Sequence, residues 1–171
     1  MTKISEFINL SDREATSQLM KCCTSDVWVE RMLNFRPFKD KQHLLEIADS
    51  AWLDLQESDY LQAFEGHPRI GDVDSLREKY EDTKEIASGE QRSVSDASDK
   101  VIIELSKNNE QYFKKFGFIF IVCATGKSAA EMLAILCARL PNDRRKELGN
   151  AAEEQRKIFQ IRLIKLFEER K

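Results

Sequence analysis

The chain has 171 residues, of which 42% are hydrophobic and 33% are charged, and its net charge is −3. This length suits one domain with a full hydrophobic core and is too short for two ordinary domains. The mixed composition excludes extensive disorder, and the slightly negative charge gives no general attraction to nucleic acid or to an anionic membrane. We therefore expect a single compact domain over residues 1–171 that binds neither nucleic acid nor membrane.

The location of the protein is suggested by its apolar runs and its cysteines. The longest apolar run, FIFIVCA at 118–124, is far shorter than the roughly 20 residues of a membrane span. The N-terminal residues carry acids and no long apolar run, so they do not resemble a secretory signal. The four cysteines show no CxxC spacing, which favours buried free thiols over a metal site or a disulfide. We expect a cytoplasmic protein without a metal.

Helix start signals and helical periodicity run through the first 65 residues. Ser11 with Glu14 is typical of a capping box, and Ser25 is placed to cap the next helix. Apolar residues then recur at spacings of three and four over 44–55, which predicts one buried helical stripe. Ser58 restarts a short helix that continues through Phe64.

Helical patterns continue in the second half of the chain. Residues 72–92 are polar and predict one or two short surface helices. A long helix is expected from Ser93 to the vicinity of Gly117. Ser128 with Glu131 predicts a capped helix up to Pro141, and a final helix follows from about residue 142 to the end.

The segment FIFIVCA is the one run that resembles a strand. A single strand would leave its backbone groups without a partner, so we interpret the segment as the buried continuation of a helix. The fold class that follows is all-α, with about eight helices in one domain.

The stretch FEGHPRIGD at 64–72 holds one of only two histidines. The imidazole of His67 has an ordinary pKa of about 6.5 and suits acid–base chemistry near neutrality. Pro68 keeps the preceding residue out of the α conformation, and Gly66 and Gly71 permit backbone angles that other residues resist. The alternative is a histidine that caps a helix or lies on the surface.

Three further features permit both a structural and a chemical interpretation. Glu90, beside Gln91 in SGEQ, suits the first turn of a helix as well as a site. Gly117 and Gly126 bracket a stretch that is either core or a source of free backbone amides. Arg162 either covers the edge of the core or holds a planar anionic or ureido group.

The order of these motifs is more specific than any one of them. GHPRIGD, an EQ pair about twenty residues later, FGFIFIVCATGKSAAEML, and IRL near the C-terminus follow one another in the chain. In this order they closely resemble the family of 2-oxo-4-hydroxy-4-carboxy-5-ureidoimidazoline (OHCU) decarboxylases, over essentially the whole chain.

The resemblance implies an all-helical homodimer that uses no metal and no organic cofactor. It implies the last step of the pathway from urate to allantoin, in which OHCU becomes (S)-allantoin and carbon dioxide. OHCU also decays unaided to racemic allantoin, so stereospecificity as well as rate would mark the enzyme. The rival from another class is a non-catalytic helical module that binds a partner helix.

The resemblance also implies the site residues. The catalytic residues would be His67, Glu90 and Arg162. The substrate-binding residues would be Pro68, Ala87, Ser88, Gln91, Phe120, Ile121, Val122, Cys123 and Ala124. Ala87 stands where the family commonly has a serine, and Ser88 follows it.

Overall fold

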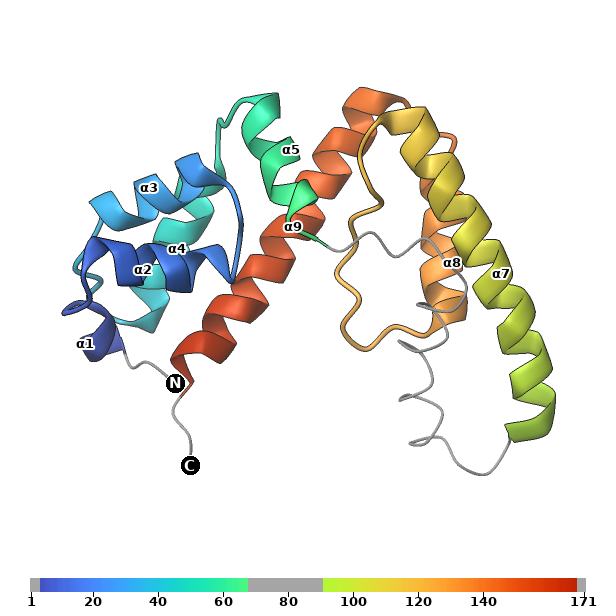
Figure 1. Ribbon diagram of the computed structural model, residues 1–171, viewed down its shortest axis with the longest axis horizontal. Coiled ribbons are helices and arrows are strands. Elements are labelled where there is room, and N and C mark those ends of the chain that lie inside the picture. Colours follow the sequence, from blue (N-terminus) through green and yellow to red (C-terminus); the bar gives the residue numbers. More distant parts are fainter. Residues whose placement is uncertain (1–3, 68–90, 169–171) are drawn as a thin grey trace. The chain divides into compact units, whose positions relative to one another are not determined.

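The computed structural model describes residues 4–67 and 91–168, and for residues 91–98 it describes the helical backbone only. These residues form eight α-helices and no strand, which confirms the predicted all-α class (Figure 1). The predicted surface helices over 72–92 lie outside the described residues except for positions 91 and 92, which belong to a long helix.

The contacts divide the chain into two units, residues 1–67 with 151–171 and residues 68–150. The division falls inside the last helix, α9, so this helix contributes to both units. The single domain over residues 1–171 stays a prediction. The first unit contains α1 (Ile4–Phe7), α2 (Asp12–Met20), α3 (Asp26–Asn34), α4 (Lys41–Trp52), α5 (Glu57–Glu65) and the second part of α9 (Arg144–Phe167).

Local signals set the predicted starts of α2 and α3, whereas α5 begins at Glu57 with Gln56 as its N-cap, so the expected start at Ser58 is wrong. The Ser11 hydroxyl accepts the backbone N–H of Glu14 and the Glu14 carboxylate accepts the backbone N–H of Ser11, so the capping box is confirmed. The Ser25 hydroxyl accepts the backbone N–H of Trp28 at the start of α3. Behind these caps lies an apolar core in which Trp28 and Phe159 are fully buried with ring centroids 5.0 Å apart.

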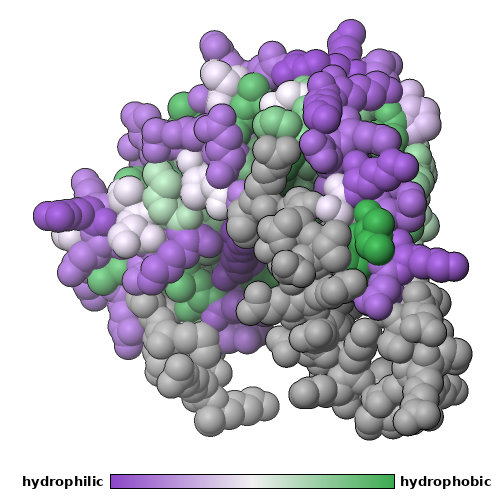
Figure 2. Space-filling model, turned by 45° about the vertical axis from the view of Figure 1, so that its right-hand side comes forward, coloured by the Kyte–Doolittle hydropathy of each residue, from purple (hydrophilic) through white to green (hydrophobic). Residues whose placement is uncertain are grey.

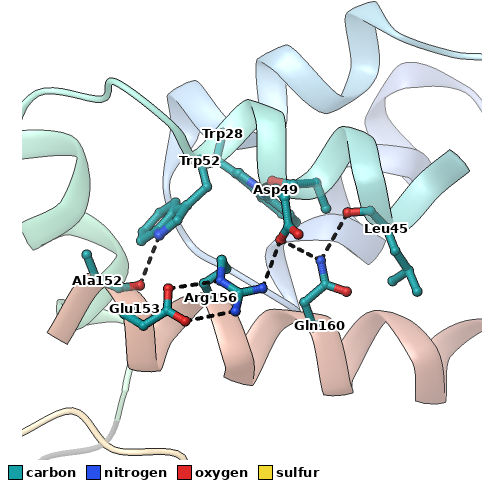
Figure 3. Close-up of polar contacts among 9 residues, drawn as sticks. Trp28, Leu45, Asp49, Trp52, Ala152, Glu153, Arg156 and Gln160 are labelled. Carbon is teal, nitrogen blue, oxygen red and sulfur yellow. Dashed lines mark hydrogen bonds and ion pairs between the residues drawn. The ribbon is translucent and has the colours of Figure 1, made fainter. Parts of the chain in front are cut away.

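The second part of α9 is fixed on α4 by polar contacts (Figure 3). The indole Nε1 of Trp52 donates to the carbonyl oxygen of Ala152 at 3.0 Å. The Gln160 amide donates to the carbonyl of Leu45 at 3.0 Å and to the carboxylate of Asp49 at 2.7 Å. These contacts lie eight residues apart along α9, so they hold both ends of this stretch of the helix.

The second unit contains α7 (Gln91–Phe116), α8 (Ala129–Arg139) and the first part of α9. The long helix ends before Gly117, whose φ of 79° is the left-handed conformation that glycine adopts most easily, as predicted. Ser128 caps α8 through the backbone N–H of Glu131. The described core of this unit consists of Ile102, Leu105, Tyr112, Phe116, Phe118, Ile121, Cys123, Met132 and Leu136.

Hydrophilic residues are spread over the face shown in Figure 2, with hydrophobic residues between them. Within residues 4–67 and 91–168, no helix is both long enough and apolar enough to cross a membrane.

Candidate active site

His67 follows the C-terminal end of α5, and Gly66 makes this position possible. Gly66 has φ −69° and ψ −12°, which is ordinary right-handed backbone, so the expected use of unusual backbone angles at this glycine is wrong. The glycine is needed for close approach instead. A Cβ atom here would overlap the Thr24 hydroxyl and would lie 2.6 Å from Thr24 Cγ2. Gly71 lies outside the described residues.

Replacing Gly66 by alanine is expected to destabilise the protein and to displace His67. Thr24 cannot simply turn away, because its hydroxyl lies 3.2 and 3.3 Å from the carbonyl oxygens of Gln62 and Ala63 in the last turn of α5. We expect a loss of about 1–3 kcal/mol in the free energy of unfolding, as for other overpacked sites. Urea unfolding measures this loss, and Thr24→Gly in the Gly66→Ala protein should restore part of it. No recovery in the double variant would contradict the steric explanation.

The imidazole of His67 is partly buried and is held by a side chain of α9. Its Nε2 lies 2.5 Å from Oε1 of Gln155, a residue with no exposed surface. Burial lowers the pKa of His67, the hydrogen bond with Gln155 raises it, and the positive charge of Arg162 lowers it further. The net effect is a pKa below 6.5, so the imidazole is neutral at pH 7 and is ready to accept a proton.

The lowered pKa predicts that stability falls on the acid side of neutrality. In the unfolded chain His67 titrates near 6.5, whereas the folded protein takes up this proton only at lower pH. Between these two values the unfolded chain binds more protons, so the free energy of unfolding is lost as the pH falls from about 6.5. Urea unfolding at a series of pH values should show this loss, and His67→Asn should reduce it. An unchanged pH dependence in that variant would argue against the shift.

Arg162 lies near His67 but is not part of the core. It is an exposed residue of α9, and its Nη1 lies 3.4 Å from the carbonyl oxygen of Cys22. A contact this long is a weak hydrogen bond, so the guanidinium keeps donors for another group. The first unit therefore brings together two predicted catalytic residues, His67 and Arg162, with a third polar residue, Gln155, that was not predicted from the sequence.

The segment 118–124 is not helical, so its interpretation as the continuation of a helix is wrong. Residues 119–124 have no regular secondary structure, and α7 ends at Phe116. Side chains take the place of helical hydrogen bonds. Arg139 Nη1 donates to the carbonyl oxygen of Ile121 at 2.7 Å, and Lys127 Nζ donates to that of Cys123 at 2.8 Å.

The carbonyls of Ile121 and Cys123 have hydrogen-bond partners, but in the part of the chain that the structure describes the backbone N–H groups of residues 120–124 do not. Ile121 and Cys123 are buried, whereas Phe120, Val122 and Ala124 are partly buried. Because backbone donors rarely remain unpaired when shielded from water, these amides are suited to bind the oxygen atoms of a ligand.

A buried charged network that was not predicted from the sequence supports this segment. Glu147 is fully buried, and its Oε1 lies 2.6 Å from Arg139 Nε and 2.7 Å from the Tyr112 hydroxyl. Burial raises the pKa of the Glu147 carboxyl, but hydrogen bonds from Tyr112, Asn142, Asn150 and Arg139 outweigh it and hold the pKa below its ordinary value. A sequence signal existed, because Arg139 continues the buried stripe of Met132 and Leu136 on α8.

Several predicted site residues cannot be placed beside the others. Pro68, Ala87, Ser88 and Glu90 lie outside the described residues. Gln91 is the first residue of α7, and its side chain is not described.

Known proteins resemble this chain over most of its length. The family model described as OHCU decarboxylase matches residues 9–164. A curated relative from Arabidopsis thaliana, the uric acid degradation bifunctional protein TTL, is 34% identical over 87% of this chain and 46% of its own length. The 2-oxo-4-hydroxy-4-carboxy-5-ureidoimidazoline decarboxylase of Haloferax volcanii is 28% identical over 82% of this chain and 81% of its own.

A solved structure agrees with these sequence matches. The crystal structure of an OHCU decarboxylase in the presence of (S)-allantoin has a TM-score of 0.70 and 33% identity, and the match covers 94% of this chain and 100% of that one. The chain spans less than half the length of the Arabidopsis bifunctional protein. Because the family model covers most of the sequence, the chain belongs to the OHCU decarboxylase family.

Proposed function

We propose that this chain converts OHCU to (S)-allantoin and carbon dioxide in urate degradation, with His67 as the acid–base group. The observation that carries the proposal is the environment of His67. The partly buried imidazole of His67 is neutral at pH 7. It contacts the fully buried amide of Gln155, and the positive charge of Arg162 lowers its pKa. A surface histidine or a helix cap requires neither burial nor such a partner.

The substrate itself supplies the electron sink for this reaction. Its carboxylate is attached to a carbon next to a C=N bond. When the C–C bond to the carboxylate breaks, the electron pair forms a C=C bond and the imine electrons move to the ring nitrogen, which takes up a proton. The hydroxyl then gives up its proton as the carbonyl forms, and the neighbouring carbon gains a proton. The protein must orient the carboxylate and deliver that last proton on one face only.

Each proposed site residue has a role in these steps. His67 accepts the proton of the substrate hydroxyl or transfers a proton to the ring. Glu90 binds the ureido N–H groups, and Arg162 and the N–H groups of residues 120–124 bind the carbonyl oxygens. Substrate contacts are also proposed for Pro68, Ala87, Ser88 and Gln91 and for the segment Phe120, Ile121, Val122, Cys123 and Ala124.

Assembly and location belong to the same proposal. We propose a homodimer, which the family resemblance supports, and size-exclusion chromatography with light scattering would test it.

We propose a cytoplasmic location because all four cysteines are free thiols. Burial raises the pKa of Cys22 to about 11 and of Cys23 to about 12, so these two thiols are protonated and unreactive at pH 7.

The decisive experiment follows the chirality of the product. OHCU is generated freshly from urate, and circular dichroism is recorded with and without the protein. Without catalysis the allantoin is racemic and gives no signal, whereas the proposed enzyme produces a signal from the S enantiomer faster than OHCU decays. The same racemic product at the same rate with and without the protein would refute the proposal and favour a helical interaction module.

A further inference from the structure

Gln155 is an unusual residue of the first unit because its amide is completely buried. Its relative exposure is 0%, and it lies on α9 one residue before Arg156, which is paired with Asp49 and Glu153 (Figure 3). Transfer of an amide from water to the interior is unfavourable unless the amide is hydrogen-bonded. A glutamine in this position therefore needs an explanation that an apolar residue would not need.

Among the described contacts, only the oxygen of this amide has a hydrogen-bond partner. Oε1 contacts Nε2 of His67 at 2.5 Å, but no hydrogen-bond acceptor lies near the buried Nε2 of Gln155 among the described residues. A methionine has a similar length and no polar atoms, so it would fill the same space without an unpaired donor. Stability therefore does not explain the glutamine, and its contact with His67 does.

This contact determines which nitrogen of His67 carries the proton. In the orientation that the Gln155 amide has in this structure, its oxygen faces Nε2 of His67. An amide oxygen only accepts hydrogen bonds, so in this orientation the imidazole donates and its proton is on Nε2. The lone pair is then on Nδ1, which becomes the basic nitrogen. The helix that carries Gln155 cannot easily move away, because Trp52 and Gln160 tie it to α4 on either side of Gln155.

We propose that Gln155 is a positioning residue for the decarboxylation, and that its side-chain carbonyl keeps the His67 proton on Nε2 so that Nδ1 is the atom that accepts the proton from the substrate. This inference rests on the proposed function. Gln155 acts only through His67.

The first test is nuclear magnetic resonance of the imidazole nitrogens, which needs no activity. The chain has only two histidines, so a ¹⁵N-labelled protein gives two imidazole patterns, and His43→Asn assigns them. His43 is an internal reference, because its Nδ1 accepts the backbone N–H of Lys39 at 3.1 Å, which also requires the proton on Nε2. We expect neutral His67 with its proton on Nε2, and Gln155→Met should shift the His67 nitrogens but not those of His43.

The second test separates positioning from a structural role. Gln155→Met should lower kcat about 100-fold, as expected when a catalytic group loses its orientation, with little change in KM. Its midpoint of unfolding should change little, because the unpaired Nε2 of Gln155 is removed while the Nε2–H of His67 loses its acceptor. Gln155→Glu keeps an acceptor opposite Nε2, so it should retain more activity than Gln155→Met. Its carboxylate should stabilise the imidazolium against the opposing charge of Arg162, which moves the acid limb of the pH profile of kcat/KM to higher pH.

Gln160→Met is the matched control, since Gln160 is another glutamine of α9 whose amide donates only to α4 among its described contacts. It should lower stability and leave kcat and the His67 signals unchanged. A His67 proton on Nδ1 in the unsubstituted protein, or full kcat in Gln155→Met, would overturn the inference. If the unsubstituted protein does not decarboxylate OHCU, the proposed function fails, and the resonance data still decide whether Gln155 fixes the tautomer.

Discussion

Replacing His67 by asparagine is expected to abolish the enantiomeric excess of (S)-allantoin while the fold is retained. Asparagine cannot exchange a proton near neutral pH, so the variant loses the acid–base contribution, which is on the order of 10²–10⁴ in rate. The remaining allantoin then comes from the unaided decay of OHCU and is racemic. Circular dichroism of the product, recorded together with carbon dioxide release, measures both the chirality and the rate.

The matched control for this variant is the other histidine of the chain. His43 lies in the first turn of α4. Its ring Nδ1 accepts the backbone N–H of Lys39, and its backbone N–H donates to the carboxylate of Asp40. His43→Asn should keep full chiral output. Unfolding experiments at pH 7.5 should show that both variants remain folded. Full S-specific output from a folded His67→Asn protein would show that another group performs the proton transfer.

Three helix starts of this protein could be predicted from the sequence because their determinants are local. Ser11, Ser25 and Ser128 each accept a backbone N–H three residues later, and the side chain and its partner lie in the same short stretch. The end of α7 was equally local, because it depends on the positive φ of Gly117. All-α architecture follows once these helices are recognised.

The errors arose where the partner lies far away in the sequence. A glycine is needed at position 66 because Thr24, 42 positions earlier in the sequence, leaves no room for a Cβ atom. The sequence alone suggested unusual backbone angles instead. The segment 118–124 avoids a helix because Arg139, which follows in α8, satisfies the carbonyl of Ile121. Gln155 lies 88 residues from His67, and no spacing rule links them. The site residues themselves stay a prediction, and the contact that holds His67 could not be predicted, because its partner is distant in the sequence.

Removing Arg139 is expected to destabilise the protein by about 3–5 kcal/mol, because Glu147 would remain as a buried charge without its partner. Arg139→Leu also removes the donors to the carbonyl of Ile121 and to the Tyr112 hydroxyl. Under the proposed function the variant should also bind substrate less tightly, since residues 120–124 lose a contact that fixes their backbone. Urea unfolding measures the stability, and KM measures the effect on binding.

A double-mutant cycle measures how much of the lost free energy of unfolding comes from the interaction between Arg139 and Glu147. Glu147→Leu alone should also be strongly destabilising, because it leaves the Arg139 charge buried, whereas the double variant should lose less than the sum. The exposed pair Lys114–Glu110 is the control, with side chains 73% and 57% exposed, and Glu110→Gln should change stability by less than about 1 kcal/mol. Additive losses for Arg139 and Glu147 would contradict a coupled pair.

Acid adds an independent test of the same network. Because the pKa of Glu147 is lowered in the folded protein, its contribution to stability is fully present above the unfolded pKa of about 4.5 and is lost as the pH falls through the folded value. Glu147→Gln lacks this titration, so its stability should fall less steeply below pH 4.5 than that of the unsubstituted protein. The same slope in both proteins would mean that other carboxylates cause the acid unfolding. A less steep slope, together with coupling in the cycle, would show that the buried Arg139–Glu147 pair stabilises the fold around the segment whose Ile121 carbonyl Arg139 binds.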